Sequence, residues 1–296
     1  MDILQEILLR FFLIYYWQET THHNLFYHPG GCSDKMRVAV KFAYDGRDFH
    51  GYARQPQLLT VERTIINALI KYGFMDNTNE SRFRSASRTD KGVSALCNVI
   101  AFDTDASKKH ILLKLSREFT TIVVYGIKDV VQEFNPRYAK LRQYQYYING
   151  VNIDLERAMS TSAVFTGEHD FCNFARVESF KNPVRSIDNI VFTWKGNFLV
   201  IDFIAQTFLW HQIRRIISAI KKVERGKLCK EQIIAALRNT DKKMDFGLAP
   251  AELLILKDIT YDFDFEYDEK SLDKLNKLES QILKRLDVLL FKPQKG

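Results

Sequence analysis

The stretch Ser85-Ala86-Ser87-Arg88-Thr89-Asp90-Lys91-Gly92-Val93-Ser94-Ala95 places an arginine two residues before an aspartate and a glycine two residues after it. Residues 96–102 are mostly apolar and indicate a strand that holds a tight polar loop in place. Arg88 and Asp90 alternate with Thr89, so in an extended loop their side chains point the same way. A nearby guanidinium keeps a carboxylate ionised, as a reaction at a sugar carbon requires. A surface ion pair has the same pattern, so this string alone decides little.

The composition is that of a folded protein with a basic excess. The chain has 296 residues, enough for one large or two modest domains. Its 46% hydrophobic content, with 22 Phe and 13 Tyr, excludes a disordered chain. Lys and Arg total 43 against 36 Asp and Glu, which gives a net charge of +7 and favours a polyanionic partner.

The cysteines and glycines argue against a metal site and a cofactor. Cys32, Cys97, Cys172 and Cys229 include no C-x-x-C pair, so we expect neither a disulfide framework nor a zinc site, and a cytoplasmic location fits. The sequence also lacks the glycine-rich loops that bind nucleotides, and we expect no cofactor. The adjacent His169-Asp170 pair has no further spaced ligands, so we interpret it as a structural turn.

Hydrophobic periodicity predicts a mixture of strands and helices. The predicted strands cover residues 38–42, 82–86, 96–102, 122–130, 143–148, 187–194, 198–205 and 253–259. The predicted helices cover residues 60–73, 111–119, 154–166, 209–220, 230–239 and 272–290. Strands in hairpin-like order with helices between them indicate the α+β class with a largely antiparallel sheet.

Several further strings lie around the Asp90 loop in a fixed order. They are Tyr44-Asp45-Gly46-Arg47-Asp48-Phe49-His50-Gly51-Tyr52, Arg54-Gln55-Pro56, Thr60-Val61-Glu62, Phe134-Asn135-Pro136-Arg137-Tyr138, Arg142-Gln143-Tyr144-Gln145-Tyr146-Tyr147-Ile148, Gly167-Glu168-His169-Asp170-Phe171, Phe208-Leu209-Trp210-His211-Gln212-Ile213-Arg214-Arg215-Ile216 and Ala249-Pro250-Ala251-Glu252-Leu253-Leu254-Ile255-Leu256. With the Asp90 loop, this series resembles archaeal-like members of the TruA family of tRNA pseudouridine synthases. The resemblance runs from Met36 to Asp262.

The resemblance implies the pseudouridine synthase fold, with two α/β halves sharing a largely antiparallel sheet and a central active-site cleft. We expect the catalytic halves at 36–139 and 140–263, followed by a charged helical tail at 264–296. The implied enzyme is an isomerase that converts uridine to pseudouridine in the anticodon stem-loop of tRNA, at positions 38 to 40. A homodimer without cofactor or metal is implied as well.

The family's catalytic residues map onto four positions. Asp90 matches the essential aspartate, and Arg88 matches an arginine that we assign to backbone contact and base extrusion, which costs a few kcal/mol. Tyr144 matches a tyrosine that stacks on the uracil and whose hydroxyl shuttles a proton. Arg214 matches the arginine that pairs with the aspartate. We expect no histidine of the matched strings to be placed for this proton transfer.

Other positions are expected to bind substrate or depart from the family pattern. Leu254 matches an apolar residue that closes the pocket, and Lys91, Arg54 and Arg215 are expected to contact phosphates. The departures are Ser87 in place of glycine, Lys91 and Ser94 in place of alanine and histidine, and Tyr52-Ala53 in place of Trp-Gln. They put RNA contacts and substrate breadth in doubt rather than activity.

The two ends lie outside the resemblance. Residues 3–17 are mostly apolar, but Gln5, Glu6 and Arg10 interrupt them, so we expect neither a signal peptide nor a membrane span. We interpret residues 1–35 as an extension that need not be native, with an accessory helix as the alternative. The tail carries a stripe that we interpret as a packing or partner face. Its members are Leu272, Leu275, Leu278, Ile282, Leu286 and Leu289.

Two other functions compete with isomerisation. A non-catalytic RNA-binding protein of the same fold would keep the basic surface, but binding alone does not require the Asp90 carboxylate. Glycoside hydrolysis by Glu168 and Asp170 would use related chemistry at a sugar carbon. The sequence shows no aromatic sugar platform beside that pair, and its basic charge favours phosphate.

Overall fold

The computed structural model describes residues 35–151, 153–178, 181–240 and 242–291. The residues from Lys35 onward form one compact unit. The expectations for residues 1–34 therefore lie outside the described residues, and everything below concerns this unit.

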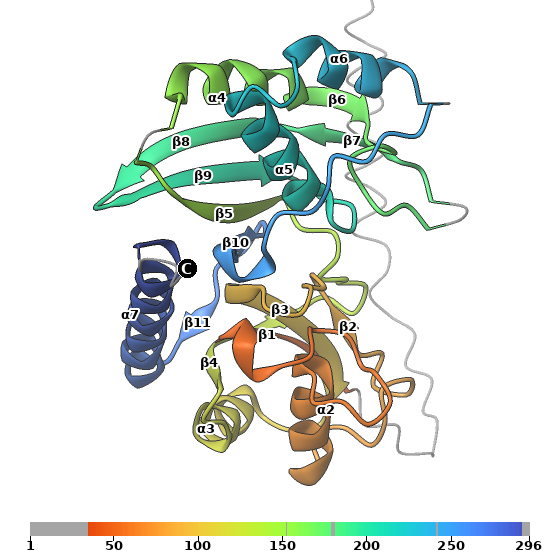
Figure 1. Cartoon of the computed structure of the whole chain (residues 1–296). Helices are drawn as coiled ribbons and strands as arrows, with labels where there is room; N and C mark the ends of the chain where they lie inside the picture. The colour runs from red at the N-terminus through yellow and green to blue at the C-terminus, as the bar shows by residue number, and fades with distance from the viewer. Residues whose placement is uncertain (1–34, 152, 179–180, 241, 292–296) are drawn as a thin grey trace, which may run out of the picture. The chain divides into compact units, whose positions relative to one another are not determined.

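A nine-stranded sheet dominates the described part of the chain (Figure 1). Its strands follow the order β11-β4-β1-β3-β10-β5-β9-β8, with the short β2 paired to β3. In chain order they are β1 (Met36–Tyr44), β2 (Arg84–Ser85), β3 (Ser94–Thr104), β4 (Ile122–Val130), β5 (Leu141–Asn149), β8 (Asn189–Lys195), β9 (Phe198–Ala205), β10 (Leu254–Thr260) and β11 (Glu266–Tyr267). The predicted α+β class and the largely antiparallel sheet are confirmed.

β10 joins the two halves of the sheet. It runs parallel to β3, with Ile255 opposite Ser94. On its other side it runs antiparallel to β5, with Leu254 opposite Tyr146. All other pairs in the sheet are antiparallel. A late segment of the sequence therefore connects strands that come from both halves.

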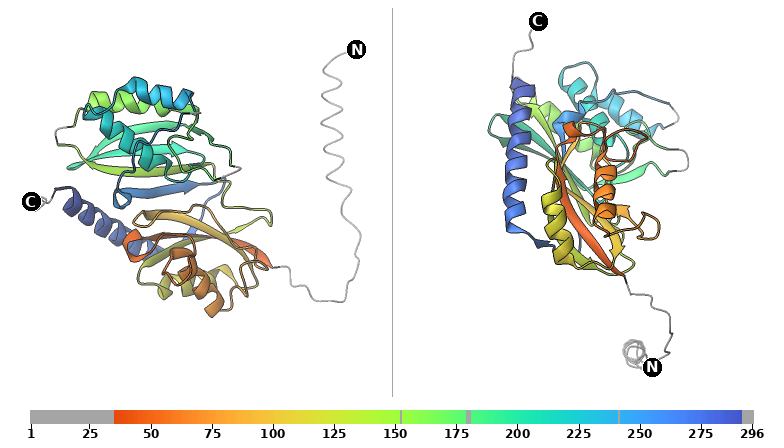
Figure 2. Two further views of the ribbon diagram at one scale, coloured as in Figure 1. Left: turned by 45° about the vertical axis from the view of Figure 1, so that its right-hand side comes forward. Right: turned by 90° about the horizontal axis from the view of Figure 1, so that it is seen from below.

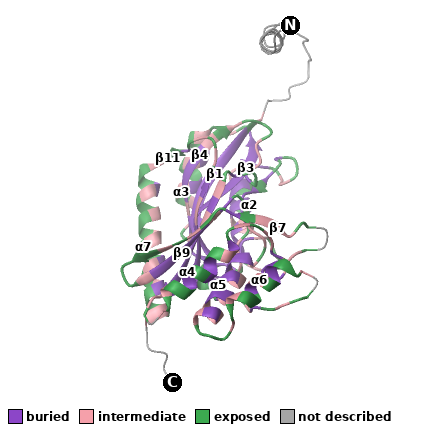
Figure 3. Cartoon of the chain, turned by 90° about the horizontal axis from the view of Figure 1, so that it is seen from above, coloured by how far each residue is buried: buried purple, intermediate pink, exposed green. Residues whose placement is uncertain are grey.

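Helices cover both faces of the sheet. They are α2 (Val61–Lys71), α3 (Lys108–Glu118), α4 (Leu155–Ser162), α5 (Gln212–Glu224), α6 (Lys230–Arg238) and α7 (Glu269–Phe291), with 3-10 turns at Gly46–Asp48, Ala163–Phe165 and Ala251–Leu253. The charge of Arg214 on α5 acts on the hydroxyl of Tyr146, whereas the charge of Glu279 on α7 acts on the hydroxyl of the next residue, Tyr147. Each helix therefore lies near one of these two neighbouring side chains. Because successive strand residues point to opposite faces, α5 and α7 lie on opposite sides of β5, as Figures 2 and 3 show.

The helical tail is part of the packed structure. Ile282 and Leu286 of α7 are fully buried, and Leu275 and Leu278 pack against the same core. Leu289 is 53% exposed, so the predicted stripe does not stay buried to its end. The apolar stripe is therefore mainly a packing face.

The expected turn at His169-Asp170 is wrong. Both residues belong to β6 (Gly167–Asp170), which forms a two-stranded sheet with β7 (Val184–Ile187). His169 lies opposite Arg185, and its Nε2 is 3.0 Å from the Thr166 carbonyl. The pairing partner lies some 15 residues further along the chain, so the local pattern gave no sign of it.

Candidate active site

The Asp90 loop lies between β2 and β3 and is held by backbone and side-chain contacts on each side of the aspartate. The Val93 N–H donates to the Asp90 carbonyl at 3.1 Å and closes the turn. The Tyr52 N–H donates to the Thr89 carbonyl at 3.1 Å, and the hydroxyls of Tyr44 and Thr89 are 2.8 Å apart. The loop is therefore fixed to the segment 44–52 rather than left free at the surface.

Two glycines allow this segment to approach the loop closely. A Cβ at Gly46 would lie 2.3 Å from the carbonyl oxygen of Val93, which is closer than any side chain tolerates. Gly51 has φ +99°, and a Cβ there would lie 3.3 Å from the Lys91 nitrogen. The string that begins at Tyr44 therefore packs directly against the backbone of the Asp90 loop and supports it.

The Asp90 carboxylate has partners on both oxygens, all from the start of α5 and the residues just before it. Arg214 Nη1 donates to Oδ2 at 2.5 Å, and Arg214 Nε donates to the Ala249 carbonyl at 2.8 Å. Trp210 Nε1 donates to Oδ1 at 2.8 Å, and His211 Nε2 lies 3.4 Å from Oδ2. The Asp90 side chain is still 20% exposed. The carboxylate is thus oriented by three groups while one side stays open.

His211 differs from its neighbours in backbone and in charge state. It precedes α5 with φ 65°, a left-handed conformation that few residues other than glycine adopt. Burial lowers the pKa of the His211 imidazole, the Asp90 carboxylate opposes that effect, and the nearby Arg214 adds to it. The imidazole beside Asp90 is therefore neutral near pH 7.

Tyr144 comes from β5 and packs beside the site. Its ring meets the ring of Phe208 edge to face, with the centroids 5.4 Å apart. It is only 8% exposed, and burial raises the pKa of its hydroxyl, an effect to which the Asp90 carboxylate adds. The hydroxyl therefore keeps its proton in the free protein.

Comparison with known proteins identifies the family of the chain that carries this site. A tRNA pseudouridine synthase A from Thermococcus sibiricus is 39% identical over 245 residues, which cover 82% of this chain and 91% of the relative. The Pyrococcus abyssi protein of the same name is 40% identical over the same length and the same shares. The one from Methanobrevibacter smithii is 32% identical over 262 residues, covering 81% and 89%. The chain belongs to the tRNA pseudouridine synthase A, or TruA, family.

Two further comparisons add less. A family profile described as tRNA pseudouridine synthase matches residues 162–262. A solved structure of a Cbf5–Nop10–Gar1 complex overlaps 65% of this chain and 54% of that chain at 11% identity and a TM-score of 0.32, too low to carry an argument. The relatives are sufficient: this TruA-family chain is a tRNA pseudouridine synthase and hence an isomerase, and the expected archaeal likeness is confirmed.

The pairing expected between Arg214 and Asp90 of this synthase is present, whereas the ion pair that the spacing of Arg88 and Asp90 suggested is not formed. The role assigned to Arg88, backbone contact and base extrusion, stays a prediction. Arg88 is exposed and, among the described residues, makes no hydrogen bond or ion pair. The guanidinium that stabilises the carboxylate comes from α5 instead. Arg88 is left available to contact substrate.

The other predicted substrate-binding residues of the synthase fall into three groups. Lys91 is exposed, next to Asp90 in the loop. Arg54 and Arg215 are paired with acidic side chains, Arg54 Nε with Glu62 at 3.4 Å and Arg215 Nη1 with Asp245 at 2.8 Å. Leu254 is 6% exposed and belongs to the core cluster.

The sequence analysis did not single out Trp210 and His211, and it expected no histidine of the matched strings to be placed for the proton transfer. The structure places His211 Nε2 3.4 Å from Asp90 Oδ2, so this histidine is a second candidate. Both residues stand in the string that contains Arg214, with Trp210 four and His211 three positions before it. Their place in that string was the available signal. Neither residue lies in α5, which begins at Gln212, and the left-handed backbone of His211 (φ 65°) just before the helix brings both side chains to Asp90.

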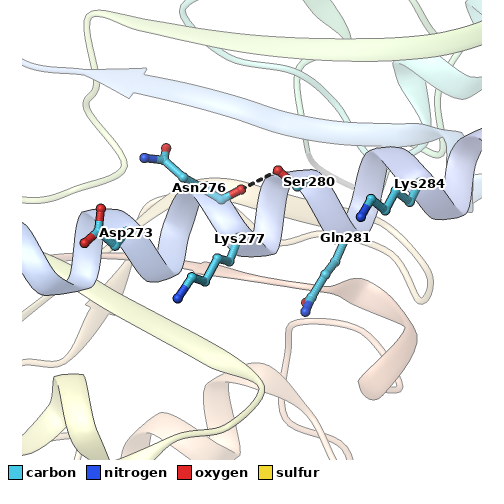
Figure 4. A pocket seen from close by; sticks show the side chains of 6 residues that line it. All are labelled: Asp273, Asn276, Lys277, Ser280, Gln281 and Lys284. Atoms are coloured by element: carbon cyan, nitrogen blue, oxygen red, sulfur yellow. Dashed lines mark hydrogen bonds between the residues drawn. The ribbon is translucent and has the colours of Figure 1, made fainter.

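Other features of the synthase lie away from this site. The hollow in Figure 4 is lined by polar side chains that all belong to α7, namely Asp273, Asn276, Lys277, Ser280, Gln281 and Lys284. In the part of the chain that the structure describes, no group of three or more His, Cys, Asp or Glu side chains is placed to hold a metal ion. No described helix has the length and apolar character that crossing a membrane requires.

Proposed function

We propose that this synthase converts uridine to pseudouridine in the anticodon stem-loop of tRNA, at positions 38 to 40, and that it works as a homodimer in the cytoplasm. The position in the tRNA, the dimer and the location rest on the family likeness of the strings around Asp90. The observation that carries the catalytic part is the Asp90 carboxylate, bonded by Arg214 at 2.5 Å and still 20% exposed.

The reaction requires little from the protein beyond placed groups. The C1′–N1 bond of uridine breaks, the detached uracil turns, and C5 bonds to C1′. The proton on C5 leaves, and N1 ends with a proton, so atoms and charges balance without an oxidant or a reductant. We assign to Asp90 the ionised carboxylate that acts at the sugar or the base. Arg214 holds that carboxylate in place from the other half of the chain.

Tyr144 is the group we assign to the proton on C5. Its hydroxyl keeps its own proton because burial raises its pKa. It therefore acts as a relay, accepting a proton from carbon as it passes its own on. Neutral His211, 3.4 Å from Asp90, is a second group able to accept a proton, and the two are told apart by substitution.

Contact with the RNA is assigned to exposed cations and one exposed ring. Arg88 and Lys91 flank Asp90 in the loop and are free to meet phosphates. Arg54 and Arg215 would first have to leave Glu62 and Asp245. Trp210 is exposed, and the guanidinium of Arg176 lies 4.2 Å from its ring centroid.

One assay tests the proposal. Transcribed tRNA labelled with tritium at uridine C5 releases tritium when pseudouridine forms, so the native chain should release it and Asp90→Asn should not. Asp90→Asn should still bind the tRNA, because the lost negative charge does not attract phosphate. Transcripts in which the uridines at positions 38, 39 and 40 are replaced one at a time locate the target. Release that persists when all three are replaced would contradict the assigned positions, and activity in Asp90→Asn would remove the aspartate from its role.

Oligomeric state needs its own measurement. Sedimentation of the purified chain should give twice the 34.6 kDa mass of the sequence. A single species at the monomer mass across micromolar concentrations would contradict the homodimer.

A further inference from the structure

Arg285 of the C-terminal helix α7 reaches the base of the catalytic loop. Its Nη1 donates to Asp45 Oδ1 at 2.5 Å, and its Nη2 donates to Ser94 Oγ at 3.3 Å. The ion pair is enclosed, since the Arg285 side chain is 9% exposed and the Asp45 side chain 5%. Enclosing two charges is costly and is a poor source of stability, so a buried pair at this place calls for another explanation.

The two partners of Arg285 support the backbone on which the Asp90 loop rests. Ser94 Oγ accepts from the Gly46 N–H at 3.0 Å, and Asp45 Oδ1 accepts from the Arg47 N–H at 3.0 Å. Asp45 and Ser94 are themselves joined at 3.4 Å. The guanidinium therefore ties the end of β1 to the first residue of β3.

From there, one step leads to the aspartate. Gly46 packs so closely on the backbone of Val93 that a Cβ would lie 2.3 Å from its carbonyl oxygen. The Val93 N–H in turn donates to the Asp90 carbonyl at 3.1 Å. A shift of Gly46 would thus displace Val93 and, with it, the turn that carries Asp90.

We propose that Arg285 is a positioning residue for the Asp90 loop, acting through Asp45 and Ser94 from the face of the sheet opposite α5. The proposal rests on the proposed role of Asp90. It makes α7 a working part of the synthase, because the helix supplies a contact that the loop needs for its geometry. A displacement of about 1 Å at a reacting group is enough to cost roughly 10²-fold in rate.

The chain offers a matched control on the same helix. Glu279 of α7 pairs with Lys257 of β10 at 2.6 Å, so it also docks α7 on the sheet, but through a strand and not through the loop. Arg285→Met keeps the apolar stem and removes the donors, and Glu279→Gln removes the charge of the second pair. If the ion pairs serve only to dock α7, the two variants should behave alike.

The experiment compares single-turnover rate, tRNA affinity and melting temperature in the full chain. We expect Arg285→Met to lower the rate by roughly 10–100-fold with tRNA affinity within about twofold of native, and Glu279→Gln to leave the rate near native. Arg285→Lys, which keeps the charge, should recover part of the rate. Adding Asp45→Asn to Arg285→Met should cost little more than the worse single variant, because the two act as one unit.

The outcomes separate the possible failures. A native rate in Arg285→Met, or equal losses in Arg285→Met and Glu279→Gln, would overturn the positioning role. If Arg285→Met does not fold, Ser94→Ala tests the same link with a smaller change, and a native rate there would also overturn it. Activity in Asp90→Asn would instead refute the proposed function, and Arg285 would then have no catalytic loop to position.

Discussion

Arg214 Nη1 and Asp90 Oδ2 are 2.5 Å apart although 124 positions separate the two residues in the chain. Asp90 stands before β3 in the first half, and Arg214 stands on α5 in the second. A second bond from Arg214 Nε to the Ala249 carbonyl at 2.8 Å fixes the plane of the guanidinium. The site is complete only where the two halves meet.

Replacing Arg214 by lysine should therefore separate charge from geometry. A lysine keeps the positive charge but has no planar fork to bond Asp90 and the Ala249 carbonyl together. We expect Arg214→Lys to lower the single-turnover rate by about 10²–10³-fold. Arg225→Lys at the end of the same helix, where the partner is the adjacent Glu224, serves as control and should stay near native. A native rate in Arg214→Lys would show that charge alone is sufficient.

Tyr144→Phe distinguishes a relay from a platform. A phenyl ring offers nearly the same stacking face, so a loss of turnover with unchanged tRNA binding isolates the hydroxyl. We expect turnover to fall by about 10²–10⁴-fold. His211→Asn, measured in parallel, should cost less. The reverse order of losses would assign the proton transfer to His211.

The salt dependence of tRNA binding should reveal which cations meet phosphates. Arg88 and Lys91 are exposed and free of ion pairs among the described residues, whereas Arg215 is bonded to Asp245 at 2.8 Å. We expect Arg88→Ala and Lys91→Ala each to reduce the slope of log affinity against log salt by about 0.7–0.9, and Arg215→Ala to reduce it less. Titrations between low and moderate salt measure this slope. Affinity that ignores salt would contradict binding through phosphates.

Gly46→Ala should damage the site without touching a catalytic group. The new Cβ would lie 2.3 Å from the Val93 carbonyl oxygen, so the loop that carries Asp90 must move. We expect the variant to be less stable by about 1–3 kcal/mol. We also expect its turnover to fall by more than the reduced fraction of folded protein can explain. Gly196→Ala, where no atom lies within 4 Å but φ is +57°, is the control for backbone strain alone. Equal activity in the two variants would contradict the role of residues 44–52 in supporting the Asp90 loop.

The stability of the synthase should fall on mild acidification through His211. Burial lowers the pKa of this imidazole in the folded chain, so the unfolded chain takes up a proton first as the pH falls. The penalty is absent above about pH 6.5 and grows as the pH drops from there towards the lowered folded pKa. Asparagine tolerates the left-handed backbone, so in His211→Asn the melting temperature should depend less on pH over this range. An unchanged slope would show that the histidine does not contribute.

Strong local patterns made the elements predictable, but not their partners. The strand predicted at residues 122–130 coincides with β4 (Ile122–Val130), because it opens with a run of branched and aromatic residues, from Ile122 to Tyr125, which favour strands. The strand predicted at 253–259 is also present as β10, yet no local feature says that it would lie between β3 and β5. Its neighbours are chosen by packing over more than a hundred residues.

The site shows the same division. Asp90, Arg214 and Tyr144 were singled out from the sequence because each stands in a string typical of the family. The pairing of Arg88 with Asp90 was expected because the two are near in the sequence, whereas the observed partner of Asp90, Arg214, lies 124 positions away on α5. His211 and Trp210 depend on a φ of 65° before α5, a backbone feature that neither periodicity nor composition predicts.

The position of β10 between β3 and β5 also determines when a chain that is being synthesised can complete its sheet and its active site. β3 and β5, its two neighbours, are both made more than a hundred residues before Leu254 is added. Until then each presents an open edge, the kind of surface that recruits strands from other chains. A nascent chain on the ribosome therefore passes through a long interval in which most of the fold has been synthesised, but the strand that joins β3 to β5 has not.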